Sequence, residues 1–298
     1  MLKSILRSRQ LLLLFLPCLL YFLIFKYYPM YGVLIAFKDY NLFKGFTESP
    51  WVGLKYFEMF FNNPDALELI RNTFLIGLYS LIWGFPAGLV LALVLNEVKK
   101  ASFKKLVQIV SYLPHFLSTV VVSGMVVSFL APRTGLINVI ITWFGGDPIH
   151  FLAEPEWFRT IYVASGIWQG MGWGAIIYLA SLSGIDPHLY EAAVMDGANK
   201  FKQLIHVTLP CIAPTIMTLF ILETGWVLTV GFEKVFLLYN PATYETADVI
   251  ETYVYRVGII GKNFSYATAI GLFVSLVSLV FLYTTNYLSK KFSDTSLW

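Results

Sequence analysis

Apolar residues gather in six long blocks along this chain, and polar segments separate the blocks. About 20 helical residues are enough to cross a hydrocarbon core about 30 Å thick. The block from Asn72 to Leu95 rises about 36 Å as a helix, at about 1.5 Å per residue. The pattern therefore predicts six membrane-spanning helices, at residues 10–30, 72–95, 106–130, 160–183, 210–230 and 266–288.

Composition supports the same fold class. Of the 298 residues, 57% are hydrophobic and only 13% are charged, against roughly 25% charged in soluble proteins. The net charge is +3 without a long run of Lys and Arg, so nucleic acid is not an expected partner. Cys18 and Cys211 lie in or beside apolar blocks, and we expect them to be small buried side chains without a disulfide. We predict an all-α membrane protein.

The first apolar block follows Lys3, Arg7 and Arg9, as a secretory signal would. A signal has an apolar region of about 7–15 residues and ends at a small-x-small cleavage site. This block instead continues into "KYYPMYGVLIAF" without such a site. We therefore expect it to be the first membrane helix.

Lysine and arginine placement predicts the orientation of the helices, because these residues concentrate in short cytoplasmic segments. Eleven lie at the N-terminus, between the second and third blocks, between the fourth and fifth, and at the C-terminus. Nine are spread over the three long loops on the other side. Both termini are expected to be cytoplasmic, with residues 1–65 forming the N-terminal helix and first outer loop and 66–298 a five-helix core.

Two outer segments are more than simple linkers. Residues 135–144, "GLINVIITWF", are apolar enough for a short helix at the membrane interface or against a partner. The loop 231–263 is rich in Tyr and Phe, which suits both an aromatic belt and a docking surface for an external protein.

Signatures of catalysis and of nucleotide binding are missing from the sequence. There is no G-x-x-x-x-G-K-[ST] phosphate loop, and "GMGWG" at 170–174 lies within a predicted membrane helix, which favours close helix packing. The four histidines lack the i, i+4 spacing of a metal-binding helix. We expect no catalytic residue, metal site or cofactor in this chain.

A polar segment interrupts the apolar pattern between the fourth and fifth blocks. Asp186 followed by Pro187 is typical of a helix start, and Gly197 suits the left-handed turn that ends a helix. A second short helix then leads into Leu209 and Pro210. These residues predict a helix-turn-helix at about 186–209, which we call the knuckle; a solvated linker and a docking element fit it equally well.

The spacing within the knuckle resembles a known signature. Glu191-Ala192-Ala193, three residues, Gly197, nine residues and then Val207-x-Leu209-Pro210 is similar to the conserved loop of permease subunits of binding-protein-dependent ABC importers, which usually have Ile where Val207 stands. "FKYYPMYGVLIAFKDYN", "SPWVGLKYFEMF", "RNTFLIG" and "LYNPATYETADVIETYVYRVGI" resemble the carbohydrate-uptake branch. Within that branch, the likeness is to permeases for plant-wall and uronate-rich oligosaccharides, such as aldouronate or pectin fragments.

The resemblance implies a transport subunit with the six-helix type I importer fold in a bacterial cytoplasmic membrane. Its partners would be a second related permease, two ATPase subunits that bind ATP and Mg²⁺, and an extracytoplasmic sugar-binding protein. The knuckle would be the coupling helix that seats in an ATPase. Its coupling residues would be Glu191, Ala192, Ala193, Asp196, Gly197, Leu209 and Pro210.

Residues for the substrate pathway follow from the predicted spans. Glu223 is an acidic residue inside a span, which is a functional hypothesis by default. Trp226, Gln169, Trp173 and Asn72 can join it, because sugars are held by hydrogen bonds and aromatic faces. Packing against a partner permease, or against one another, explains the same residues.

A stand-alone secondary transporter or channel for a polar solute is the alternative function. Such a protein needs coupling-ion residues in its spans and often has repeated halves. Apart from Glu223 and Lys26 the predicted spans are almost free of charge, and no repeat is visible.

Overall fold

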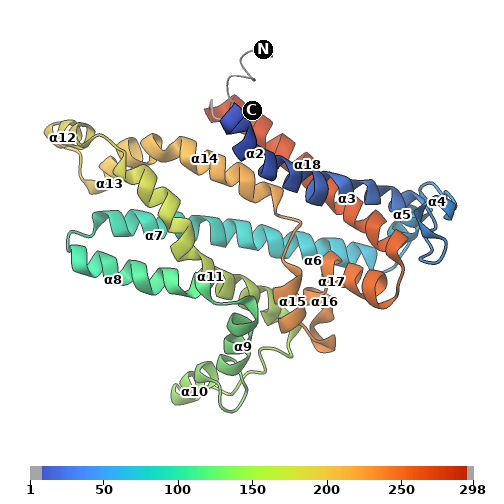
Figure 1. Cartoon of the computed structure of the whole chain (residues 1–298). Coiled ribbons are helices and arrows are strands. Elements are labelled where there is room, and N and C mark those ends of the chain that lie inside the picture. The colour runs from blue at the N-terminus through green and yellow to red at the C-terminus, as the bar shows by residue number, and fades with distance from the viewer. Residues whose placement is uncertain (1–8, 294–298) are drawn as a thin grey trace. The chain divides into compact units, whose positions relative to one another are not determined.

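The computed structural model describes residues 9–293, and their regular elements are helices with two isolated bridges, Lys38–Trp51 and Asn41–Gly45 (Figure 1). The chain divides into two compact units. Among the described residues, the first unit holds 9–64 and Val254–Phe273, and the second holds Asp65–Tyr253 and 274–293. The all-helical prediction is confirmed for the described residues.

The first unit begins with a long apolar helical run. It passes through α2 (Arg9–Phe22), a π-helical turn, α3 (Tyr28–Met30) and a 3₁₀ segment (Tyr31–Phe37). Short helices α4 (Gly45–Glu48) and α5 (Lys55–Phe61) follow. Aromatic side chains of α5 pack against the start of α18 (Phe264–Ser293), with Phe60 and Phe273 ring centroids 5.9 Å apart.

A buried lysine organises the loop before α4. The amine of Lys38 donates to the carbonyl of Phe46 at 2.7 Å. It also lies over the rings of Phe46 and Trp51, at 4.5 and 4.9 Å from their centroids. A cation held between two aromatic faces and a carbonyl is stabilised without an acidic partner.

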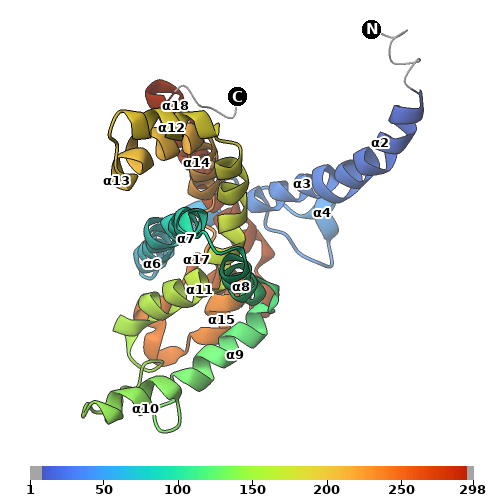
Figure 2. The same cartoon turned by 90° about the vertical axis from the view of Figure 1, so that its left-hand side faces the viewer.

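The second unit contains most of the helices. In chain order they are α6 (Ala66–Tyr79), α7 (Phe85–Glu97), α8 (Ala101–Tyr112), α9 (Thr119–Phe129), α10 (Leu136–Trp143), α11 (Pro155–Ser183), α12 (Pro187–Met195), α13 (Lys200–Gln203), α14 (Leu209–Gly225), α15 (Phe232–Leu238), α16 (Tyr244–Ala247) and α17 (Ile250–Val254). A π-helical turn, Ser80–Gly84, joins α6 to α7 as one continuous run. The short helix predicted at 135–144 is confirmed as α10, which lies far from α12 and α13 in both views of this unit (Figure 2).

Four helices of the described chain are long and apolar enough to cross a membrane, at Leu12–Phe37, Ala66–Glu97, Lys200–Gly225 and Phe264–Lys291. They overlap the first, second, fifth and sixth predicted blocks, but the first continues to Phe37 and the fifth begins at Lys200 and ends at Gly225. The third block, predicted as one helix over 106–130, is instead broken, because α8 and α9 meet at 104°. Pro114 lies in the 3₁₀ turn at the break, and the Ser118 hydroxyl caps α9 by accepting from the Val121 N–H at 3.3 Å.

The fourth block is α11, whose 29 residues are long enough to cross a bilayer. It is not among the four apolar helices, because glycines, Gln169 and aromatic residues dilute its hydropathy. In the second unit α11 contacts α6, α7, α8, α9, α14, α15 and α16. A helix covered by protein on most sides does not need the composition of a lipid-facing helix.

Glycines let α11 approach its neighbours closely. A Cβ at Gly172 would stand 2.9 Å from the backbone nitrogen of Tyr112, and one at Gly88 would stand 3.2 Å from the carbonyl carbon of Gly174. The packing interpretation of "GMGWG" is confirmed. The expected burial of the cysteines is wrong: Cys18 and Cys211 are free but exposed, because they lie on outward faces of apolar helices and not in a protein core.

Candidate functional site

The knuckle has the predicted helix-turn-helix structure. The Asp186 carboxylate accepts from the N–H of His188 at 3.0 Å and caps α12, which starts at Pro187. Gly197 has φ of +75°, in the left-handed region that favours glycine. The Asn199 side chain then accepts from the N–H of Lys202 at 2.9 Å and caps α13. The local signals in the sequence are confirmed as caps and turn.

The knuckle presents an apolar surface to the outside. No residue of α12 is buried against the rest of the described chain. Its exposed apolar side chains are Leu189, Val194 and Met195, joined by Phe201 of α13. An exposed apolar patch with a charged rim is typical of a docking surface.

The residues of the predicted coupling set lie along this surface and the helix that follows. Glu191, Ala192, Asp196 and Gly197 are exposed, Ala193 is half-buried, and Leu209 and Pro210 begin α14. The carboxylate of Glu191 lies 3.2 Å from Nδ1 of His188. The predicted coupling residues therefore lead directly into α14, which is part of the membrane-length helix Lys200–Gly225.

Polar contacts hold the two helices of the knuckle together and join the knuckle to α7. The hydroxyls of Tyr190 and Thr208 are 3.0 Å apart, and Nε2 of Gln203 donates to the carbonyl of Ala198 at 2.9 Å. The amine of Lys200 lies 3.0 Å from the carboxylate of Glu97, at the end of α7. The first two contacts therefore lie within the knuckle, and the ion pair joins the knuckle to the end of α7.

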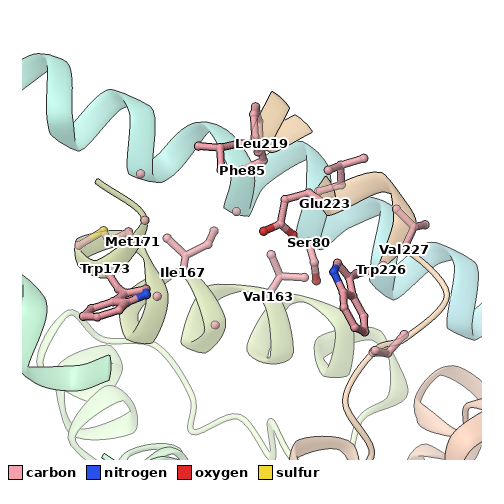
Figure 3. A pocket seen from close by; sticks show the side chains of 18 of the residues that line it. Ser80, Phe85, Val163, Ile167, Met171, Trp173, Leu219, Glu223, Trp226 and Val227 are labelled. Carbon is pink, nitrogen blue, oxygen red and sulfur yellow. The ribbon is translucent and has the colours of Figure 1, made fainter. Parts of the chain in front are cut away.

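A cavity of about 530 Å³ lies inside the second unit. Its walls come from the α6–α7 run, α11, α14 and the segment up to α15. Figure 3 shows the Glu223 carboxylate directed into it near Ser80, with Trp226 on the same side and Trp173 at the other end. The polar and aromatic lining residues are Ser80, Phe85, Tyr162, Trp173, Tyr178, Glu223, Trp226, Thr229 and Lys234.

The structure brings three of the five predicted pathway residues together in this cavity: Glu223, Trp226 and Trp173. The indole of Trp173 is held in place by stacking on the His115 ring, with centroids 4.5 Å apart and planes 3° from parallel. Trp226 is the C-cap residue of α14, where its backbone N–H donates to the carbonyl of Glu223 at 3.0 Å, and its side chain is mostly exposed. Indole faces and a carboxylate suit a sugar, which offers both C–H faces and hydroxyl donors.

The other two predicted residues do not line the cavity. Gln169 donates from Nε2 to the carbonyl of Leu117 at 3.2 Å, beside the break between α8 and α9. Asn72 is fully buried, and its amide donates to the carbonyls of Glu245 and Asp248 at 3.0 and 3.1 Å. Its Oδ1 accepts from Arg159 at 2.8 Å. Both side chains connect elements of the second unit.

Lys234 is the one charged residue of the cavity lining that the sequence did not predict. Its side chain is 8% exposed, and its amine donates to the carbonyl of Tyr162 at 2.8 Å and lies 4.6 Å from the centre of the Tyr162 ring. Burial lowers the pKa of Lys234 to about 8. The only signal in the sequence is the segment "GFEKVF", where Glu233 and Lys234 lie between apolar residues.

Groups of three or more His, Cys, Asp or Glu side chains placed to hold a metal ion do not occur in the described residues. The chemistry of the cavity is that of hydrogen bonding, ring stacking and one charge of each sign.

Comparisons with known proteins give the family. Residues 84–294 match the family described as "Binding-protein-dependent transport system inner membrane component". The chain is 47% identical to Protein LplB of Bacillus subtilis over 98% of this chain and 92% of that protein. It is 45% identical to the polygalacturonan/rhamnogalacturonan transport system permease protein YteP of the same organism, over 100% and 93%.

Solved structures agree on the fold. A bacterial ABC transporter involved in the import of the acidic polysaccharide alginate has a chain 44% identical to this one, with a TM-score of 0.90 over 98% of both chains. The alginate ABC transporter in complex with an alginate pentasaccharide-bound periplasmic protein has a TM-score of 0.91 at 44% identity, over 99% of both chains. This chain therefore belongs to the inner-membrane components of binding-protein-dependent transport systems, which are transport subunits and not enzymes.

Proposed function

We propose that this chain is the membrane permease subunit of an ATP-driven importer for oligosaccharides, with uronate-containing plant-wall fragments as the substrate class. The observation that carries the proposal is the cavity of Trp173, Trp226 and Glu223 in a chain of this family. The names of the relatives support the substrate class, since they transport polygalacturonan and rhamnogalacturonan or import alginate.

In this function the chain crosses the membrane six times with both termini in the cytoplasm. The four apolar helices supply four crossings, and the bent α8–α9 pair and the central α11 supply the other two. The orientation rests on the Lys and Arg residues in the short segments, which include the knuckle.

The knuckle is the coupling element of the subunit. Its exposed apolar residues, including Met195 and Phe201, seat in a groove of an ATPase subunit. The small side chains of Ala192 and Ala193 allow close approach, and Gly197 makes the turn. ATP and Mg²⁺ bind the two ATPase subunits, while a second, related permease completes the membrane pathway.

An extracytoplasmic binding protein delivers the sugar to the outer loops. The complex of the alginate transporter with its saccharide-bound periplasmic protein is the precedent. In the cavity, Trp173 and Trp226 stack on sugar rings and Glu223 accepts hydroxyl hydrogen bonds. Gln169 and Asn72 hold the surrounding helices in position.

The test is uptake and ATP hydrolysis by the complete importer, reconstituted with its partner subunits and binding protein. Gly197→Val and Glu191→Lys should abolish sugar-stimulated ATP hydrolysis and uptake, while the protein still inserts and purifies at the wild-type level. Gly184→Ala is the matched control, because a Cβ there stands 3.4 Å from the carbonyl of Ser181, an ordinary contact.

Normal uptake by both knuckle variants would refute the coupling role. Uptake by the permease chains alone, driven by an ion gradient without ATPase subunits, would identify a secondary transporter instead.

A further inference from the structure

We propose that Lys234 and Gly166 form a carboxylate-binding subsite in the cavity, which takes a uronate group of the transported oligosaccharide. The inference rests on the proposed import function and assigns the residues that give it selectivity for acidic sugars.

The first argument is that Lys234 is buried without an acidic partner. An ammonium group has three donors, and the structure gives this one a single acceptor, the Tyr162 carbonyl. The three ion pairs found among the described residues involve other lysines or a histidine. Glu251, from α17, accepts from the N–H groups of Gly231 and Phe232, and its Oε2 is buried without a hydrogen-bond partner, so it does not pair with Lys234. A buried cation without an anion is costly, which makes an anionic ligand a favourable partner.

The second argument is that the amine is accessible from the cavity through a missing side chain. Lys234 and Gly166 both line the cavity. A Cβ at position 166 would stand 3.3 Å from Nζ of Lys234, closer than an ordinary contact. The glycine therefore leaves room beside the amine for ligand atoms.

The third argument is that the rest of the lining suits a sugar that carries both hydroxyls and carboxylates. The volume of 530 Å³ falls in the range of roughly 300–1,000 Å³ that is usual for small-molecule sites. Trp226 and Trp173 expose 64% and 48% of their surfaces and offer faces for stacking. Glu223 accepts from hydroxyls, and Lys234 neutralises a carboxylate, so a neutral sugar leaves the buried amine without its partner.

The amine carries its charge under ordinary conditions. With a pKa of about 8, Lys234 is mostly protonated at pH 7. The carboxyl of a uronate is ionised at the same pH, so the two groups attract each other across the cavity.

The experiment compares an acidic and a neutral sugar in the complete importer, reconstituted in proteoliposomes with its partner subunits. Trigalacturonate and galactotriose are offered at equal concentration, and the ratio of their initial uptake rates is measured. Lys234→Gln and Gly166→Ala should each lower the acidic-to-neutral ratio about 10-fold or more, the effect of losing a hydrogen bond to a charged group. Lys234→Arg should retain most of the preference.

Gly170→Ala is the matched control for the ratio. It adds the same methyl group to the same wall of α11, but the new Cβ has no atom within 4 Å. It should therefore keep the wild-type ratio even if it changes both rates.

The outcomes separate the subsite from the proposed function. Equal losses for both sugars in Lys234→Gln and Gly166→Ala would overturn the subsite and leave sugar import standing. A wild-type importer that carries galactotriose and excludes trigalacturonate would also overturn it. A wild-type importer that carries neither sugar would refute the proposed function itself.

Discussion

Replacing Gly172 with alanine tests the closest helix contact in the second unit. A Cβ at this position would overlap the backbone carbonyl of Ser111 and stand 2.9 Å from the backbone nitrogen of Tyr112. Ordinary carbon contacts begin near 3.4 Å. The obstructing atoms are backbone, so rotating a side chain gives no relief, and α11 must move away from α8.

The cost follows from two opposing effects. Overpacking of a filled interior costs typically about 1–3 kcal/mol, and rigid backbone on both sides places this change at the upper end. Alanine recovers about 1 kcal/mol because it is the better helix former. The net loss is about 2 kcal/mol, or about 4–8 °C in Tm at about 2–4 °C per kcal/mol for chains of this size class.

The assay is thermal unfolding of the purified protein in detergent, followed by tryptophan fluorescence. Gly170→Ala, two residues away on the same helix, is the control, since its new methyl group meets nothing within 4 Å. We expect this control to unfold at the wild-type temperature or slightly above it. A Gly172→Ala protein with the wild-type midpoint would refute the contact between α8 and α11.

Three further predictions concern buried polar groups. Asn72→Leu removes three hydrogen bonds of about 1 kcal/mol each. Thermal unfolding should therefore show that the free energy of unfolding falls by about 2–3 kcal/mol. An unchanged unfolding midpoint would contradict this structural role of Asn72 and favour its direct role in transport. The ratio of acidic to neutral sugar uptake should fall as pH rises through about 8, where Lys234 loses its proton. The ratio should not change with pH in Lys234→Arg. The groups nearest to the Lys234 amine include Tyr162, and Glu223 lies in the same cavity. Lys38→Met removes a hydrogen bond and two cation–π contacts. Amide hydrogen exchange should therefore become faster across residues 38–51 and stay unchanged in the second unit. Exchange rates equal to those of the wild type across residues 38–51 would contradict this local role of Lys38.

The knuckle could be predicted because its signals are local. Asp186 and Asn199 cap helices that start within three residues of them, and Gly197 supplies a backbone conformation that depends on one residue. The same reasoning applies to the break between α8 and α9, where Pro114 gave a signal that the hydropathy pattern alone concealed. Hydropathy reports on lipid exposure, and both parts of the broken helix are apolar.

The cavity could be predicted only in part because its members are far apart in sequence. Asn72 is polar and lies in an apolar block, as a pathway residue would, but its partners are 173 and 176 residues away. Nothing in the local pattern of α6 indicates that this side faces Glu245 and Asp248. For Lys234 the sequence misleads in the opposite direction, because it places this residue in an outer loop and not in a span. Only the packing of α15 on α11 places Lys234 in the cavity wall.

Three helices connect the knuckle with the cavity. The end of α7 is joined to the knuckle through the Glu97–Lys200 ion pair, α11 ends shortly before α12, and α14 follows α13 through a π-helical turn. Each of the three also contributes to the cavity wall. Because helices are stiff along their axes, a displacement of the knuckle is carried about 21 Å along α14, from Leu209 to Glu223.

Two sides of the cavity belong to different helices, α14 and α11, so a movement of one helix relative to the other changes the shape of the cavity. Glu223 lies on α14 with Trp226 at its end, whereas the Lys234 amine is held by the Tyr162 carbonyl of α11. A tilt of α14 relative to α11 therefore changes the distance from Glu223 and Trp226 to the buried amine of Lys234. In the proposed mechanism, a sugar held by both helices loses one set of contacts when that distance grows, so movement of the knuckle would weaken its binding. Differential affinity between the two arrangements is what an ATP-driven importer needs to release its substrate.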